Sequence, residues 1–215
     1  MRHESRDGVE KSLPCHVTLP VRREIGSLRK WRVVREIEAS FRKACSRNGF
    51  RLVHYSIQDD HAHLIIETDD AERLGCGMKS ITARFARAVN RALGRSGPVL
   101  RDRYHLEVLE TPRQVRNALA YVLLNARRHA AKRLAKLQKL GKAVPALPKA
   151  SVLDAASSAR WFEGWRSDVA LDRSPPRALG WAPAVEAAKT WLLTQGWRRH
   201  GLIDPNEIPG GLRAT

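Results

Sequence analysis

The hydrophobic pattern of residues 1–110 predicts a small sheet and two helices. Short apolar and β-branched runs predict strands at residues 16–21, 50–57, 61–67 and 104–109. Apolar residues recur at helical spacing over residues 28–48, and a second helix is expected between an N-cap at Asp69 or Asp70 and Leu93. The order β-α-β-β-α-β is that of an α+β fold with a ferredoxin-like split βαβ antiparallel sheet.

A further helix is predicted after this sheet. Thr111 is a good N-cap, Pro112 suits the first helical position, and Gln114 suits the third, where its side chain returns to the cap. Helical spacing continues to Leu140, and Gly141 is expected to end the helix.

The rest of the chain is predicted to be a linker and a tail. Residues 141–149 contain two prolines, whereas residues 150–215 hold five of the six tryptophans and a short helix expected over residues 183–195. We therefore divide the chain into a domain at residues 1–140, a linker at 141–149 and a Trp-rich helical tail at 150–215. The tryptophans are expected to anchor this tail rather than to stack on unpaired bases.

Charge and cysteine content indicate the type of partner and the compartment to expect. Lys and Arg number 39 against 22 Asp and Glu, a net charge of +17, which favours a polyanionic partner and nucleic acid first. No apolar run is long enough to span a membrane, and the polar N-terminus lacks the apolar core of a secretory signal. Three widely spaced cysteines without a C-x-x-C pair are typical of the cytoplasm, where we expect the protein to lie.

Two histidines one residue apart are the first candidate for chemistry. On a strand, His61 and His63 point to the same face, about 7 Å apart at Cβ, and can converge on one metal ion. Ala62, Leu64 and Ile66 point to the other face, where helices can cover them. By itself, an H-x-H pair is more often two half-buried surface histidines.

One face of the added helix is the second candidate. At 100° per residue, several side chains fall within about 40° of one line. They are a phenol, an amide and three cations: Tyr121, Asn125, Arg128, Lys132 and Lys139. No acidic residue occurs from Thr111 to Leu153. A solvated basic helix would explain the cations but not the Tyr-Asn pair among them.

Together these segments resemble a known family. Y-S-I-Q-D-D-H-A-H-L-I-I-E, then R-D-R-Y-H, then A-Y-V-L-L-N-A-R-R-H are similar to segments of the REP-associated tyrosine transposases, which belong to the HUH endonucleases. The resemblance covers residues 16–128. His61-Ala62-His63 matches the His-hydrophobic-His motif, and Tyr121 with Asn125 matches a nucleophile followed by a metal-binding amide. The tail segment T-W-L-L-T-Q-G-W-R-R-H-G-L is also similar to tails of this family.

The resemblance implies a transposase-like strand transferase, with residues 1–140 as its catalytic domain. Tyr121 would attack a phosphodiester of single-stranded DNA, leaving a 5′-phosphotyrosine and a free 3′-OH. His61, His63 and Asn125 would bind Mg²⁺ or Mn²⁺. The substrate would be hairpin DNA from palindromic repeats, bound by a monomer or a homodimer. Candidate phosphate contacts are Arg101, Arg103, Arg127, Arg128 and Lys132.

The chain departs from the family pattern at two places. The family usually carries Met-Pro-Asn before its first motif histidine, where this chain has Gln58-Asp59-Asp60, and Pro after the helix amide, where this chain has Ala126. Tyr104 is a rival nucleophile, but a strand tyrosine without a neighbouring amide is more often a packing residue. We expect His54, His105 and His129 to be structural or surface groups.

Three other functions compete with this interpretation. A domesticated, non-catalytic DNA- or RNA-binding protein on the same fold would share the charge pattern. A rolling-circle replication initiator or relaxase would share the HUH chemistry, although the motif order or tyrosine count usually differs. A zinc-dependent nucleobase deaminase needs H-x-E together with P-C-x-x-C, whereas this chain has H-A-H at residues 61–63 and no C-x-x-C.

Overall fold

A computed structural model describes residues 12–47, 49–166, 170–174 and 182–210. Its centre is a five-stranded antiparallel sheet in the order β2-β3-β4-β1-β5. The strands are β1 (Leu13–Pro20), β2 (Ser46–Arg47), β3 (Phe50–Ile57), β4 (His61–Thr68) and β5 (His105–Val108). Strands β3, β4, β1 and β5 have the order of a split βαβ sheet, so the predicted α+β fold is confirmed.

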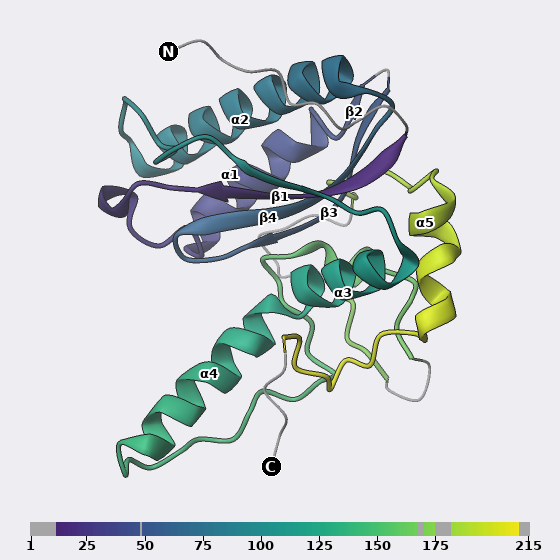
Figure 1. The fold of residues 1–215 in the computed structure, drawn as a ribbon. Coiled ribbons are helices and arrows are strands. Elements are labelled where there is room, and N and C mark those ends of the chain that lie inside the picture. The colour runs from purple at the N-terminus through teal and green to yellow at the C-terminus, as the bar shows by residue number, and fades with distance from the viewer. Residues whose placement is uncertain (1–11, 48, 167–169, 175–181, 211–215) are drawn as a thin grey trace.

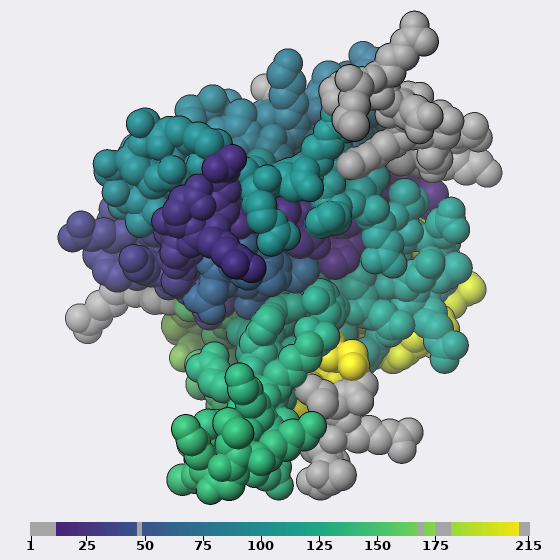
Figure 2. Space-filling model, turned by 60° about the vertical axis from the view of Figure 1, so that its left-hand side comes forward, coloured from purple at the N-terminus to yellow at the C-terminus, as the bar shows by residue number. Residues whose placement is uncertain are grey.

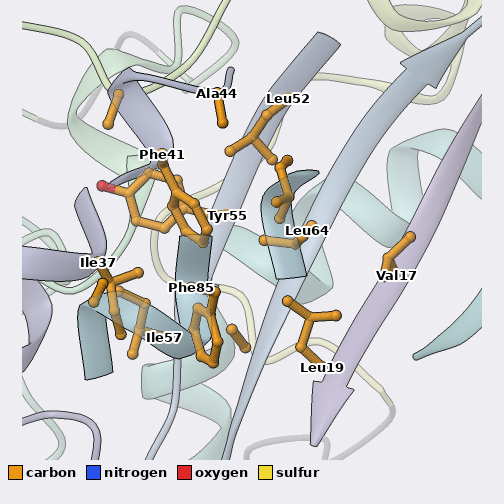
Figure 3. Close-up of a cluster of buried hydrophobic side chains, with 14 of the residues drawn as sticks. Val17, Leu19, Ile37, Phe41, Ala44, Leu52, Tyr55, Ile57, Leu64 and Phe85 are labelled. Carbon is orange, nitrogen blue, oxygen red and sulfur yellow. The ribbon is translucent and has the colours of Figure 1, made fainter. Parts of the chain in front are cut away.

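Helices α1 (Trp31–Arg42) and α2 (Ala71–Leu93) cover one face of the sheet (Figure 1). The buried side chains between them and the sheet form one apolar core, which includes Phe41, Tyr55, Phe85 and Leu64 (Figure 3). Phe41 lies at the centre, with ring centroids 5.2 Å from Tyr55 and 6.2 Å from Phe85. As predicted, α2 starts after Asp70, whose carboxylate accepts a hydrogen bond from the Arg73 amide.

The first and third predicted helices differ from expectation. Helix α1 ends at Arg42 rather than at residue 48, because the chain turns to form β2. The helix predicted to continue to Leu140 is interrupted at Leu124, which separates α3 (Pro112–Leu123) from α4 (Asn125–Lys139). The apolar stripe of α3 is buried, whereas only Asn125 of α4 is buried. The chain therefore leaves the body where its apolar stripe ends, and α4 projects outward (Figure 1).

Most buried side chains of the tail lie with α3 on the sheet face opposite α1 and α2, whereas Ala156 and Ala184 belong to the first core. Trp165 and Trp197 are buried with α3 in a second core, and their indole N–H groups donate to the carbonyls of Ala159 and Leu193. The anchoring expected of the tail tryptophans is thus confirmed for these two, whereas Trp191 is exposed and Trp181 lies outside the described residues.

The prediction of one helix over residues 183–195 is wrong in its extent. Only α5 (Trp191–Thr194) forms there, followed by the 3-10 helix η3 (Gly196–His200). The buried carboxylate of Glu67 accepts hydrogen bonds from the Lys189 and Thr190 amides and from the Thr190 hydroxyl. The Glu186 amide donates to the carbonyl of Leu52, so the chain before α5 is held extended along the sheet.

A buried ion pair joins the tail to α1. Arg160 donates to both carboxylate oxygens of Glu38 at 3.0 Å, and the Tyr55 hydroxyl donates to the same carboxylate. All three side chains are almost completely buried. Loss of one partner would leave an uncompensated buried charge, so this pair fixes the path of the tail. No helix of the described residues is long and apolar enough to cross a membrane.

Two glycines of α2 provide a matched test of the first core. A Cβ added at Gly77 would lie 2.2 Å from the Phe50 ring, whereas one at Gly75 would meet nothing within 4 Å. Gly77→Ala should therefore destabilise the protein by about 1–3 kcal/mol, because the ring must move. Gly75→Ala should stabilise it by roughly 0.5–1 kcal/mol, because alanine favours the helix. Urea unfolding measures both, and equal effects would contradict this packing.

A buried histidine should make stability depend on pH. His54 lies in the second core with its Nδ1 3.1 Å from the Ser158 hydroxyl, and burial lowers the pKa of His54 to about 4. The unfolded chain takes up this proton near pH 6.5, so stability should fall as the pH drops from about 6.5 to 4, by up to about 3 kcal/mol. Urea unfolding of wild type and His54→Leu over this range isolates the effect. Parallel pH dependences would show that His54 does not contribute.

Candidate active site

The register of β1 against β4 gathers polar side chains on the sheet face opposite α1 and α2. Thr18 pairs with His63 and Pro20 with His61, so Thr18 and His16 point to the same face as the two motif histidines. Ala62, Leu64 and Ile66 point into the first core, as predicted. The sheet thus places three imidazoles and one hydroxyl together.

The motif histidines face each other through one nitrogen each. The Nε2 atoms of His61 and His63 are 2.9 Å apart. On the far side of each ring, His61 Nδ1 is 2.7 Å from an Asp60 carboxylate oxygen, and His63 Nδ1 is 3.1 Å from both the Thr18 hydroxyl and His16 Nε2. Every ring nitrogen of the pair therefore has a defined neighbour.

This donor set fits a divalent cation. With only 2.9 Å between their Nε2 atoms, the two imidazoles are close enough to bind one cation together. A carboxylate only accepts, so its hydrogen bond places the His61 proton on Nδ1 and leaves a lone pair on Nε2. Among the described residues, no group of three or more His, Cys, Asp or Glu side chains could hold a metal ion.

Asn125 supplies an amide with unused hydrogen-bonding capacity. Its side chain is fully buried, and neither its oxygen nor its nitrogen has a hydrogen-bond partner among the described residues. A buried polar group without a partner is rare in native proteins and indicates a missing ion, water or ligand. Asn125 begins α4 directly after the interruption at Leu124, one turn beyond Tyr121.

Helix α3 places Tyr121 over the histidines. The centroid of its ring lies 5.0 Å from the His63 ring and 5.8 Å from the His16 ring. Tyr121 is half-buried between buried neighbours, off the stripe that packs on the sheet. The Arg128 guanidinium carbon lies 5.0 Å from the centre of the same ring, which puts a positive charge beside the phenol.

A cavity of about 700 Å³ opens beside these groups. Its lining includes Tyr121, His16, His63 and Thr18 on one side and residues 207–210 on another. This C-terminal segment lies against α3 and α4 (Figure 2). Arg116 holds it through two hydrogen bonds of 2.9 and 2.8 Å to the Glu207 carboxylate.

Burial and neighbouring charge keep the central histidine neutral. Burial lowers the pKa of His63 far below its ordinary value, and the neighbouring imidazoles and the Arg128 guanidinium act in the same direction, because a proton on His63 would be repelled by any positive charge around it. The pKa of His16 is also lowered by burial, although Glu107, 3.8 Å from its Nδ1, acts in the opposite direction. A neutral imidazole is the form that binds a cation.

The predicted phosphate contacts have different surroundings. Arg128 lies against Tyr121, and Lys132 is exposed one turn further along α4. The Arg127 guanidinium donates to the carbonyls of Asn206 and Pro148, so it is already engaged in holding the tail. Arg101 and Arg103 are exposed in the segment before β5.

The rival nucleophile lies away from the histidine pair. Tyr104 is partly buried and packs against the first core. Tyr121 faces the histidines from the opposite side of the sheet. Of the two tyrosines, Tyr121 is thus the one beside the polar cluster.

Sequence reasoning missed two histidines of the site. His16 contacts His63, and the ring centroid of His129 lies 6.4 Å from that of His61. The H-V-T segment at residues 16–18 repeats the alternation of H-A-H, and its pairing with β4 would have predicted the contact. His129 follows Asn125 by one helical turn, which places it at the same end of α4.

Three solved structures are similar to this chain at low sequence identity. A REP-associated tyrosine transposase bound to a REP hairpin is 16% identical, with 60% of this chain and 74% of its own covered and a TM-score of 0.48. A putative transposase from Deinococcus radiodurans is 15% identical, with coverages of 66% and 100% and a TM-score of 0.39. A bacterial tRNA(His) guanylyltransferase-like protein in complex with GTP is 13% identical, with coverages of 62% and 72% and a TM-score of 0.40.

The sequence profile of one family extends over most of the sheet and the tyrosine helix. Proteins of curated function gave no match. The profile described as "Transposase IS200 like" matches residues 10–122, which include the motif histidines and Tyr121. That segment is more than half of the chain, and the protein therefore belongs to the family of IS200-like transposases.

Proposed function

We propose that this protein is a metal-dependent, single-tyrosine strand transferase that cleaves and rejoins single-stranded hairpin DNA. The observation that carries the proposal is the position of Tyr121 beside the histidine pair. The centroid of its ring lies 5.0 Å from that of His63, and the Nε2 atoms of His63 and His61 are 2.9 Å apart. A phenol beside a pair of metal-binding nitrogens is the arrangement that this reaction needs. Residues 1–140 would form the catalytic domain.

Tyr121 acts as the nucleophile in this proposal. Its phenolic oxygen loses its proton and attacks the phosphorus, forming a 5′-phosphotyrosine, while the bond to the 3′ oxygen breaks and that oxygen gains a proton. The covalent link retains the energy of the phosphodiester, so a 3′-OH can reverse the step. The Arg128 guanidinium beside the ring offsets negative charge on the phosphate.

His61, His63 and Asn125 would hold one divalent ion, Mg²⁺ or Mn²⁺. When bound, such an ion supplies a Lewis acid for the non-bridging phosphate oxygens. The chain's own part is to orient the ligands: Asp60 fixes the His61 ring, and Thr18 holds His63. The unpartnered, buried amide of Asn125 supports its inclusion.

A single-stranded or hairpin DNA is the proposed substrate. One structure similar to this chain holds a REP hairpin, and we extend that substrate class to this protein. The basic surface of α4, with Lys132 next to Arg128, would track the phosphates that pass Tyr121. Arg101, Arg103 and Arg127 remain candidate phosphate contacts.

Tyr121→Phe should abolish the covalent adduct and leave DNA binding unchanged, because only the hydroxyl is removed. The measurement is incubation with labelled DNA and Mn²⁺, followed by denaturing electrophoresis. An unpaired strand or hairpin should form the adduct, and a blunt duplex should not. Tyr104→Phe is the matched control and should retain it. If the adduct persists in Tyr121→Phe, Tyr104 becomes the candidate nucleophile. If the wild type forms no adduct, a non-catalytic binding protein is favoured.

Mn²⁺ binding should depend on the three proposed ligands. We expect His61→Ala and His63→Ala to abolish binding measured by calorimetry, and Asn125→Ala to weaken it. Thr18→Val removes the hydroxyl beside His63 without changing the shape, and loss of such an outer partner typically weakens metal binding about 10–100-fold. His105→Ala, on the edge strand β5, is the control. Unchanged affinity in both histidine variants would rule out this site.

A further inference from the structure

A charged crevice lies between helices α1 and α2, on the opposite side of the sheet from Tyr121. Its volume is about 300 Å³. Four cations line it, with one carboxylate and one hydroxyl: Lys43, Arg84, Arg87, Arg91, Glu36 and Ser40. We call it the α1/α2 crevice. It shares no residue with the cavity beside Tyr121.

Most of the positive charge of the crevice has no counter-charge among the described residues. Glu36 is paired with Arg91, with 2.8 Å between the carboxylate oxygen and Nε. Lys43, Arg84 and Arg87 make no hydrogen bond or ion pair with any described residue. Three cations thus surround a small volume whose only carboxylate is already neutralised, which attracts an anion.

Ser40 gives the crevice an unused hydrogen-bond donor. This residue is only 7% exposed, and its hydroxyl oxygen has no hydrogen-bond partner in the described part of the chain. A buried hydroxyl normally finds a partner, so one is missing here. A hydroxyl together with guanidinium groups is suited to the several oxygens of one phosphate group.

Two further features of α1 and α2 favour a nucleic acid as the source of that phosphate. Arg84, Arg87 and Arg91 follow one flank of α2 over about 10 Å, a row of cations rather than a single point. At the start of α1, Trp31 is 54% exposed, and the guanidinium groups of Arg32 and Arg35 lie 5.4 and 5.1 Å from its ring. Cations interleaved with an exposed aromatic ring are typical of surfaces that bind nucleic-acid strands.

We propose that the α1/α2 crevice binds a backbone phosphate of a nucleic acid, at a contact separate from the one at Tyr121. The sheet lies between the two, with α1 and α2 on one side and α3 on the other (Figure 1). A strand that reaches both must pass around the sheet edge, so the crevice contacts a different segment from the one that is cleaved. This extends the proposed function, and its test uses an independent measurement.

The test is equilibrium binding of a labelled DNA strand, long enough to reach both faces, at several salt concentrations and without divalent cations. Arg87→Gln should weaken binding and lower the log-log salt slope by roughly 0.7, the value for one phosphate contact of a single strand. Lys79→Gln is the control, because it removes an exposed charge from the same helix outside the crevice. Ser40→Ala should weaken binding several-fold without changing the slope, because no charge is lost.

Equal effects of Arg87→Gln and Lys79→Gln on affinity and slope would overturn the proposal. Inorganic phosphate provides the second arm, measured by thermal stabilisation of the wild type and of Arg87→Gln. If phosphate stabilises only the wild type while both proteins bind DNA equally, the crevice takes a small free anion and the nucleic-acid proposal fails. Binding without divalent cations does not depend on catalysis, so failure of Tyr121 as nucleophile would leave this result intact.

Discussion

The antiparallel pairing of β1 with β4 is the constraint on which the site depends. Side chains alternate along a strand, so a slip of one residue would send His61 and His63 into the apolar core and Leu64 to the other face. Burial of Leu64 and its neighbours Ala62 and Ile66 under α1 and α2 makes that slip costly. The hydrophobic face of β4 therefore fixes the position of its polar face, and the same register brings Thr18 of β1 beside His63.

The interruption at Leu124 divides the added helix into a part that packs and a part that faces solvent. Val115, Leu119 and Val122 bury α3 against the sheet and the tail, and this packing sets the height of Tyr121 above the histidines. Beyond Leu124 the chain has too few apolar side chains to stay on the body. A straight helix would have to expose the α3 stripe or bury lysines, so the change of direction relieves this conflict.

Local sequence signals predicted the helix starts and the alternation along the strands. Long-range contacts determined the interruption at Leu124 and the path of the tail. The N-cap at Asp70 and the capping box at Thr111 lie within a few residues of the helices they start, and both form as expected. The alternation of His61 and His63 was equally visible, because a strand has a fixed period. The interruption at Leu124 was not predictable from local signals, because neither Pro nor Gly marks it, and its cause is the packing of α3.

The path of the tail depended on partners that are far away in sequence. The Glu67 carboxylate accepts hydrogen bonds from the amides of residues 189 and 190, about 120 positions later in the chain. These bonds hold the preceding segment extended, so α5 starts after the predicted position at Pro183. His16 joined the site in the same way, since its contact with His63 requires the pairing of two strands. Neither of these long-range contacts can be predicted from the local sequence pattern.

The use of arginine explains how a chain with a net charge of +17 presents positive charge at selected places. Three arginine–carboxylate pairs join the tail to the body: Arg29–Asp154, Arg116–Glu207 and Arg160–Glu38. These pairs use acidic residues that would otherwise neutralise the surface. The remaining cations include Lys132 on α4 and Arg84 and Arg87 on α2, for which no counter-charge is found among the described residues. Internal pairing of carboxylates thus both fastens the tail and leaves the two charged surfaces free to attract phosphate.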